Sequence, residues 1–197
     1  LGQSSLPVPK TLLVKYPIDI DFVEKNIGYP AIIKTLSGSF GAGVFLSENR
    51  KQLQQLLKMA EITKPSYNII IQEFIKDSYG KDLRVLVVNG KVAGCMMRQS
   101  IDDDFRANIT RGGEGIPYQI DADIEWLGGE SARLLNLDIA GVDLLFDGDG
   151  YKICEVNSSP GFEGMDKYTK TNVAEQIVTY VKHKIGYSDN RNETWVR

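Results

Sequence analysis

Two short stretches, Gly141-Val142-Asp143-Leu144-Leu145 and Cys154-Glu155-Val156-Asn157, decide how this chain folds around its most informative side chains. Each is an apolar run interrupted by an acid or an amide, and turn-forming residues separate them, which predicts a hairpin from Ile139 to Val156. Side chains two residues apart on a strand share a face, so Glu155 and Asn157 point the same way. We expect the opposite face to be apolar, with Val142, Leu144, Phe146, Cys154 and Val156.

Asp143 joins this row of oxygen ligands only if the hairpin register allows it. Directly paired residues share a face, so Asp143 opposite Glu155 requires an odd loop such as Gly148-Asp149-Gly150, or a bulge. A regular two-residue turn would pair Asp143 with Cys154 instead. Hard divalent cations such as Mg²⁺ prefer carboxylate and amide oxygens. The row therefore predicts a metal site, and the alternative is the solvated polar face of an ordinary hairpin.

A glycine-rich loop, Ser37 to Gly43, follows Lys34 at the end of an expected strand. Glycines let backbone N–H groups turn toward a phosphate, and lysine supplies a point charge. The loop is not a Walker A motif, because no Gly-Lys-Ser/Thr follows and both flanks look like strands. On its own, an ordinary flexible hairpin explains this loop about equally well.

Three arginines, Arg98, Arg106 and Arg111, lie in or beside a long polar segment from Ser100 to Pro117. Loops of this length in a compact domain are usually functional or disordered. Arginines gathered in an acidic protein indicate a site for phosphate or carboxylate anions. The alternative is a solvated loop that balances the acidic run at 102–104.

The remaining pattern mixes antiparallel hairpins with helices, which predicts an α+β fold rather than a regular βαβ array. Asn89-Gly90 is a strong type I′ turn signal between two strands. Ser47 is expected to cap a helix that buries Leu53, Leu56, Leu57 and Ala60. The other expected helices span 19–27, 123–135 and 171–185, and the expected strands span 31–34, 44–46, 68–75, 83–88 and 92–98.

Bulk composition excludes several classes of protein. The net charge of −3 over 197 residues argues against a nucleic-acid binder with a general basic surface. No run approaches the roughly 18 apolar residues that span a bilayer, and no signal peptide is visible. The two cysteines lie in apolar runs without zinc-site spacing, which favours a reduced, cytoplasmic protein. His183, the single histidine, reads as a solvated helix-end residue, so a His-based triad is not expected.

Together these pieces resemble the ATP-grasp superfamily, and within it the RimK-type alpha-L-glutamate ligases. Family members read close to Gln-Glu-(Phe/Tyr)-Ile, Asp-x-Arg, Phe-Arg-x-Asn-x-x-Arg-Gly-Gly, Gly-Val-Asp and Glu-Val-Asn-x-Ser-Pro-Gly. The resemblance covers roughly residues 5 to 185 in the same order. The chain carries Gln72-Glu73-Phe74-Ile75, Asp82-Leu83-Arg84, Phe105-Arg106-Ala107-Asn108-Ile109-Thr110-Arg111-Gly112-Gly113, Gly141-Val142-Asp143 and Glu155-Val156-Asn157-Ser158-Ser159-Pro160-Gly161.

The resemblance implies a role for each matching residue. The strand from Gln72 to Ile75, with Glu73 and Phe74, would line the adenine pocket, and Asp82 would bind the ribose side. Phosphates would be held by Lys34, Ser37, Gly38, Arg106, Ala107 and Asn108. Asp143, Glu155 and Asn157 would carry two Mg²⁺ or Mn²⁺ ions. Arg98 and Arg111 would face the acyl-phosphate and the substrate carboxylates as catalytic residues.

The implied reaction joins a carboxylate to an amine at the expense of ATP, through an acyl-phosphate and with release of ADP. The amino acid is expected to be glutamate, and the acceptor a protein C-terminus, a peptide or a small acid. Ligases of lysine or arginine synthesis on carrier proteins, and coenzyme glutamate ligases, share nearly the same core and stay open. A non-catalytic ATP-binding regulatory module is the alternative from another class. No nucleic acid or membrane partner is expected, and the full-length protein is expected to be a homo-oligomer.

The resemblance also implies how the chain divides. We expect a small ATP-grasp subdomain with the phosphate loop at residues 1–71, a C-terminal subdomain with the metal and substrate site at 72–187, and a frayed tail at 188–197. Family members begin with a further N-terminal domain and a helix that carries another phosphate-binding lysine. Both would precede Leu1, and Lys10 and Lys15 are poor substitutes for that lysine.

Overall fold

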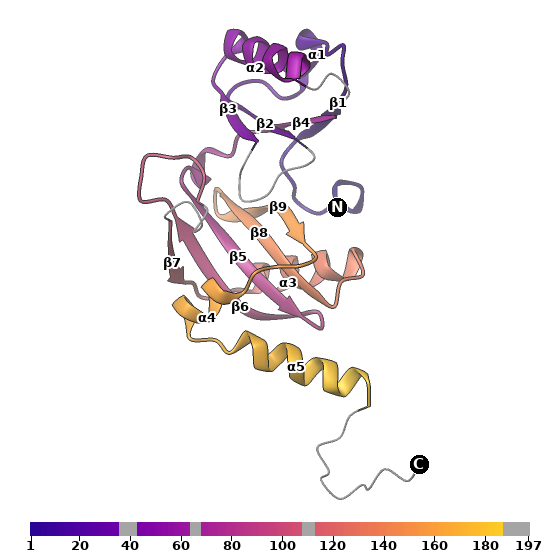
Figure 1. Ribbon diagram of the computed structural model, residues 1–197, viewed down its shortest axis with the longest axis vertical. Coiled ribbons are helices and arrows are strands. Elements are labelled where there is room, and N and C mark those ends of the chain that lie inside the picture. The colour runs from indigo at the N-terminus through magenta and orange to yellow at the C-terminus, as the bar shows by residue number, and fades with distance from the viewer. Residues whose placement is uncertain (36–42, 64–67, 108–112, 187–197) are drawn as a thin grey trace, which may run out of the picture.

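The computed structural model describes residues 1–35, 43–63, 68–107 and 113–186. Figure 1 shows two antiparallel sheets, the smaller at the top and the larger below it. Helices and antiparallel sheets in this arrangement confirm the expected α+β class. In the part of the chain that is described, no helix is both long and apolar enough to cross a membrane.

The small sheet has four strands and is covered on one face by two helices. Its order is β1-β4-β2-β3. The core between sheet and helices includes Val23, Ile33, Leu53 and Ile71, all buried. The elements are η1 (Gly2–Ser4), β1 (Thr11–Val14), α1 (Ile20–Asn26), β2 (Ala31–Thr35), β3 (Val44–Ser47), α2 (Arg50–Thr63) and β4 (Ile69–Glu73).

The start of α2 differs from the expectation that Ser47 caps this helix. Ser47 is the last residue of β3 and is fully buried, and its hydroxyl donates to the Asn49 carbonyl oxygen at 3.1 Å. The side chain of Asn49 accepts from the Gln52 N–H at 3.1 Å instead, as a capping residue does. Serine and asparagine both favour cap positions. Ser47 pairs with Ala31 of β2 and so extends the strand, which leaves Asn49 as the cap.

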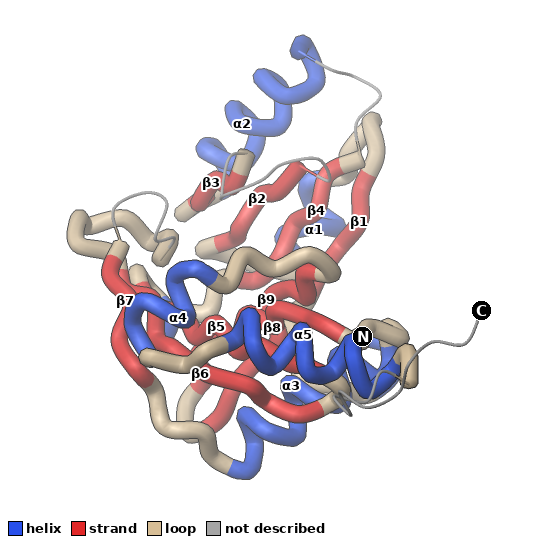
Figure 2. Tube along the Cα trace, turned by 60° about the horizontal axis from the view of Figure 1, so that its bottom comes forward, coloured by secondary structure: helices blue, strands red, loops and turns tan. Residues whose placement is uncertain are grey.

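The large sheet has five strands in the order β7-β6-β5-β8-β9. One helix, α3, packs on one face, and α4 and α5 lie on the other (Figure 2). Leu83, Val85, Ile124 and Leu144 belong to the main core beneath α3. The elements are η2 (Lys76–Ser78), β5 (Lys81–Val88), β6 (Lys91–Gln99), β7 (Glu114–Pro117), α3 (Ala122–Leu134), β8 (Ile139–Asp147), β9 (Gly150–Asn157), α4 (Glu163–Thr169) and α5 (Val173–Lys184).

The turn between β5 and β6 confirms the sequence signal. Asn89 and Gly90 have φ of 51° and 74°, so both central residues are left-handed, as a type I′ turn requires. Besides the two short 3-10 helices η1 and η2, three elements were not expected from the sequence: β1, β7 and α4. Of these, β7 forms the last four residues of the segment that was expected to be a loop, where Ile116 pairs with Met97 of β6.

The β8–β9 hairpin reaches the expected pairing by a bulge. Asp147 pairs with Gly150 across a two-residue turn, so the expectation of an odd loop is wrong. Further along, Leu144 pairs with Ile153 while Asp143 pairs with Glu155, which leaves Cys154 as the extra residue of a bulge. The bulge alternative is therefore confirmed. Cys154 does not belong to the apolar face, because it lines the cavity beside Glu155.

The N-terminal segment contacts both sheets. The Pro7 carbonyl oxygen accepts from the Ile153 N–H of β9 at 2.8 Å, and Leu6 is buried in the core of the large sheet. A few residues later, Thr11 begins β1 of the small sheet. The chain thus passes from the large sheet to the small one near Lys10, and returns after β4.

Candidate functional site

A cavity of about 840 Å³ lies between the two sheets. Such a volume suits a nucleotide-sized ligand. The small sheet contributes Ile32, Lys34, Val44 and Gln72 to its wall. The large sheet and the segments around it contribute most of the remaining wall, including Asp82, Arg84, Arg98, Arg106, Asp143, Glu155, Asn157, Pro160, Lys167 and Tyr168.

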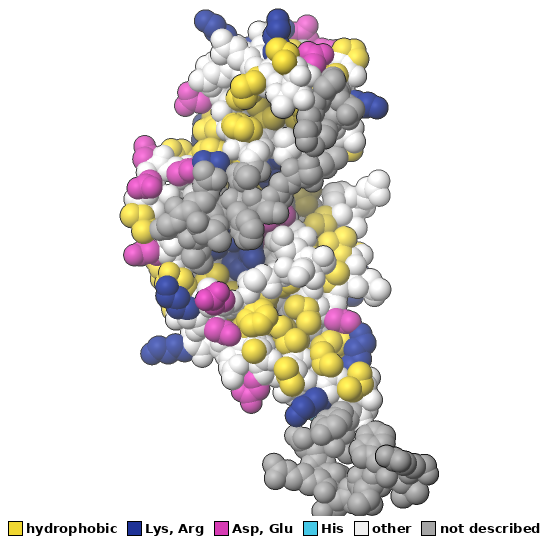
Figure 3. Space-filling model, in the orientation of Figure 1, with side chains coloured by type: hydrophobic (Ala, Val, Ile, Leu, Met, Phe, Trp, Pro, Cys, Tyr) yellow, Lys and Arg dark blue, Asp and Glu magenta, His cyan; other side chains and the backbone are white. Residues whose placement is uncertain are grey.

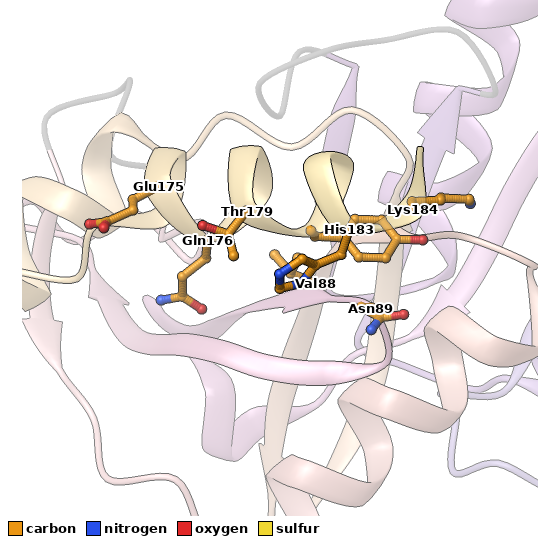
Figure 4. A pocket seen from close by; sticks show the side chains of 8 residues that line it. Val88, Asn89, Glu175, Gln176, Thr179, His183 and Lys184 are labelled. Carbon is orange, nitrogen blue, oxygen red and sulfur yellow. The ribbon is translucent and has the colours of Figure 1, made fainter. Parts of the chain in front are cut away.

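A second, shallow hollow lies between α5 and the β5–β6 turn and contains none of the motif residues (Figure 4). Two of its residues, Tyr180 and Lys184, bond to the carboxylate of Asp138. Hydrophobic side chains gather over this part of the molecule (Figure 3), and Val178 of α5 and Ile185 just after it are exposed. His183 is exposed near the end of α5, as expected. The motifs therefore single out the cavity between the sheets.

Four charged side chains alternate on the floor of that cavity. Asp82 and Arg84 stand two residues apart on β5 and so share a face. Asp82 pairs directly with Arg98 of β6, and Arg84 pairs directly with Asp143 of β8. The Arg98 guanidinium donates to both oxygens of Asp82 at 2.7 Å, and its Nη2 lies 3.0 Å from Asp143 Oδ2.

Asp143 is held by arginine on both of its oxygens. Arg84 Nε donates to Oδ1, and Arg84 Nη2 donates to Oδ2 at 2.8 Å. Burial alone would raise the pKa of Asp143, but the Arg98 and Arg84 guanidiniums outweigh burial and hold it below its ordinary value. Asp143 is therefore a carboxylate at neutral pH, although its side chain is only 5% exposed.

The predicted row of oxygen ligands comes together along one edge of this floor. Asp143 and Glu155 are direct cross-strand partners, and Asn157 Nδ2 donates to Glu155 Oε1 at 3.1 Å. All three line the cavity. Among the described residues, no group of three or more His, Cys, Asp or Glu side chains is placed to hold a metal. The row instead combines two carboxylates with one amide, a donor set that fits Mg²⁺ or Mn²⁺ completed by phosphate oxygens.

Lys34 lines the same cavity as this row but belongs to the small sheet. Its ammonium donates to Gln72 Oε1 at 2.9 Å and lies 3.5 Å from Cys154 Sγ, so it reaches across the cavity to the bulge. Gln72 in turn donates to Thr11 Oγ1 at 2.9 Å. Burial raises the pKa of Cys154 to about 11, although Lys34 opposes the shift, so this thiol stays protonated at neutral pH.

The expected adenine strand ends where the two sheets meet. The Glu73 N–H donates to the Lys10 carbonyl oxygen, and the Glu73 carboxylate accepts from the Lys10 N–H, both at 2.9 Å. The same carboxylate accepts from Lys152 Nζ of β9 at 2.8 Å. Phe74 and Ile75 both line the cavity, and the Phe74 ring meets Phe105 edge-on, with centroids 6.4 Å apart.

The remaining phosphate candidates are described only in part. Arg106 binds Asp104, with Nη2 2.7 Å from Oδ2, and its Nη1 lies 3.4 Å from the Val44 carbonyl oxygen of the small sheet. Ala107 is buried in the cavity wall. Four further candidates lie outside the described residues: Ser37, Gly38, Asn108 and Arg111.

Sequence reasoning missed two participants. Arg84 belongs to the quoted Asp82-Leu83-Arg84 motif, and strand parity alone would have placed it beside Asp82, but no role was assigned to it. Lys152 gave no sequence signal, because its partner Glu73 lies on the other sheet, while its second partner Asp147 lies on the same hairpin.

Comparison with known proteins agrees with this geometry. Residues 1–181 match the RimK-like ATP-grasp domain family. A probable alpha-L-glutamate ligase of a Marinomonas species is 37% identical over 92% of this chain and 60% of its own length. One from Rhodopirellula baltica is 34% identical over 96% of this chain and 46% of its own length. The chain thus spans about half of the length of these relatives.

Solved structures share the fold at low identity. The ATP-grasp ligase PsnB, complexed with a minimal precursor, Mg and ADP, has a TM-score of 0.69 and 19% identity, over 92% of this chain and 56% of its own. Its likeness supports the ATP-grasp arrangement of two sheets around the cavity. The family match over residues 1–181 shows that the chain belongs to the family of RimK-like ATP-grasp domains.

Proposed function

We propose that the protein containing this domain is an ATP-dependent carboxylate–amine ligase that forms an amide through an acyl-phosphate and releases ADP. One observation carries the proposal: Lys34 of the small sheet reaches Cys154, the residue before Glu155, and lines the same cavity as Asp143, Glu155 and Asn157. A cation on one wall and oxygen ligands on the other suit a polyphosphate bound together with a divalent cation.

Each residue is assigned a task within this reaction. The strand Glu73 to Ile75 and Asp82 bind the nucleoside, while Lys34, the Ser37-Gly38 loop and Arg106 to Asn108 bind its phosphates. Arg111 and the buried Arg98 provide positive charge where the carboxylates react. Mg²⁺ or Mn²⁺, as two ions on Asp143, Glu155 and Asn157, would supply charge neutralisation on the phosphoryl group. Segments 1–71 and 72–187 are proposed as the two halves of the grip, with Gln72 and Glu73 completing β4 of the small half and Leu6 packing in the core of the large half.

The amino acid is proposed to be L-glutamate, because the curated relatives are named as probable alpha-L-glutamate ligases. The acceptor is a carboxylate of a peptide, a protein C-terminus or a small acid, and PsnB, which was also solved with a precursor peptide, is a fold relative that binds a peptide. Ligation of lysine or arginine precursors on a carrier protein, and glutamylation of a coenzyme, are the alternatives. Both cysteines are free thiols, which suits the proposed cytoplasmic location.

The test is ADP release by the full-length protein across a panel of amino acids and acceptor carboxylates. The proposal expects ADP release that requires both a carboxylate and an amine, with glutamate most active. Magnesium-dependent ATP binding without turnover on any pair would favour a non-catalytic ATP-binding module. Size-exclusion chromatography with light scattering on the same preparation tests the expected homo-oligomer.

A further inference from the structure

Asp143 is the most heavily engaged carboxylate on the cavity floor. Arg84 contacts both of its oxygens, and Arg98 Nη2 lies 3.0 Å from Oδ2. A carboxylate offers about four lone-pair positions, so guanidinium groups fill most of those on Asp143. A divalent cation that approaches Asp143 therefore competes with arginine for the same oxygens.

The formal charges of the four side chains on the cavity floor also sum to zero. Arg84 and Arg98 balance Asp82 and Asp143, and the side chains of this set are 5% to 16% exposed. Solvent and salt screen such a buried set weakly. A free cation that approaches Asp143 is therefore repelled by two arginines. Of the three proposed metal ligands, Glu155 is the one whose negative charge is not balanced by this set.

The two arginines are not equivalent. Arg98 directs Nε and Nη2 to Asp82 at 2.7 Å, and its contact with Asp143 is additional. Arg84 directs Nε and Nη2 to Asp143 and is its direct cross-strand partner. Arg84 also lines the cavity where phosphates would lie. A metal that binds Asp143 would therefore either share this carboxylate with Arg84 or displace Arg84 from it.

We propose that Arg84 is the counter-ion of Asp143, and that it makes divalent-cation binding at the row depend on the nucleotide. The proposal rests on the proposed function, since it takes Asp143, Glu155 and Asn157 as the metal site. The nucleotide phosphates bring the negative charge that the neutralised floor lacks, and Arg84 then has anionic oxygens beside it. Arg84 is thus a positioning residue that couples the two ligands.

The test measures Mn²⁺ binding to the full-length protein by electron paramagnetic resonance, with and without a non-hydrolysable ATP analogue. Wild-type protein should bind Mn²⁺ weakly alone and tightly with the analogue. Arg84→Met keeps the length of the side chain but removes its charge, and should bind Mn²⁺ alone at least about tenfold more tightly than wild type. Arg133→Met removes an exposed arginine paired with Glu130 on α3 and should bind as wild type does.

Equal or weaker Mn²⁺ binding by Arg84→Met would overturn the proposal. Arg84→Lys keeps the charge and should retain the weak binding of the wild type. Since Mn²⁺ replaces the missing cation, it should also raise the melting temperature of Arg84→Met but not that of wild type. If Arg84→Met is unfolded without metal, recovery of its fold by Mn²⁺ supports the proposal, and no recovery contradicts it.

One double variant separates this inference from the proposed function. Adding Glu155→Gln to Arg84→Met should abolish the gained Mn²⁺ affinity if the row is the metal site. Retained affinity would place the metal elsewhere and refute the row itself. Loss of affinity in the double variant, together with equal affinities of Arg84→Met and wild type, would leave the row standing and refute only the role of Arg84.

Discussion

Glu155 lines the cavity, is exposed, and bonds to its neighbour Asn157 rather than to an arginine. Its removal therefore leaves the apolar core and the floor ion pairs intact. We expect Glu155→Gln to lower ATP-dependent turnover by about 100-fold or more, because an anionic metal ligand is lost. Its unfolding free energy should stay within about 0.5 kcal/mol of wild type. ADP release and urea unfolding measure the two quantities.

Asp149 provides the matched control for Glu155, since it lies exposed in the turn of the same hairpin. Asp149→Asn removes one negative charge, as Glu155→Gln does, and should keep wild-type turnover. Equal losses in the two variants would show that the net charge of the hairpin, and not a metal ligand, sets the rate.

The reactivity of the Cys154 thiol tests its placement in the cavity. The thiolate is the reactive form, and burial raises the pKa of this thiol to about 11. Alkylation by iodoacetamide in a Cys95→Ala background should therefore be slow at pH 7 and rise about tenfold per pH unit up to about pH 10. Magnesium–ATP should slow the reaction, because Cys154 lies beside Lys34 in the cavity. A plateau near pH 8.5, typical of a free thiol, would contradict the placement.

Single residues were predictable from the sequence where a motif and strand parity agreed. Glu155 and Asn157 came together on one face by parity, and Asp143 joined them through the bulge that was one of two expected routes. The prediction that Cys154 lies on the apolar face was wrong. A bulge adds one residue to the strand, and the local sequence pattern does not show at which position. The ion pairs of Arg98 depend on pairing of three strands, which no local pattern encodes.

Among the secondary-structure elements, β7 and α4 pack closely where Gly115 meets Tyr168. A Cβ at Gly115 would lie 2.7 Å from Cγ of Tyr168, a ring that also lines the cavity. We expect Gly115→Ala to displace this ring, to lower the unfolding free energy by about 1–3 kcal/mol and to weaken substrate binding. Thermal unfolding and the Michaelis constants for both substrates measure the effect. Gly150→Ala, with no heavy atom closer than 4.0 Å to its Cβ, is the control that should change neither.

Elements were predictable where their own pattern was strong. The β5–β6 turn follows from Asn89-Gly90, and helix α2 follows from the apolar spacing of Leu53, Leu56, Leu57 and Ala60. The unexpected elements, β1, β7 and α4, have four to seven residues each. Segments this short have no stable structure alone, and they form because neighbouring strands and helices pair with them.

On the scale of the whole molecule, Glu73 and Lys152 tie the two sheets together at 2.8 Å. Burial opposes ionisation of Glu73, but Lys152 and the Lys10 N–H outweigh it and hold the pKa of Glu73 below its ordinary value of 4.5. This stabilisation is present above that value and is lost as pH falls through the pKa of the folded protein. Wild type should exceed Glu73→Gln in stability by about 1 kcal/mol or less at pH 7, and the difference should shrink as the pH falls below 4.5.

Urea unfolding of both proteins across this pH range measures the difference. The same pair compared in a Lys152→Met background isolates the bridge, because the difference should then shrink at every pH. A difference that is constant from pH 7 to pH 3 would show that Glu73 stabilises the protein in some other way.

The chain crosses between the sheets at Lys10 and again after Glu73, and these two crossings are bonded to each other by both N–H groups. Two adjacent chain crossings define a hinge axis. Rotation of one sheet relative to the other about this axis disturbs fewer contacts than sliding or twisting does. We expect spin labels on α2 and α4 to approach each other when nucleotide binds, while labels flanking Lys10 and Glu73 keep their distance. Unequal motion at the two crossings would mean that the cleft closes by shear.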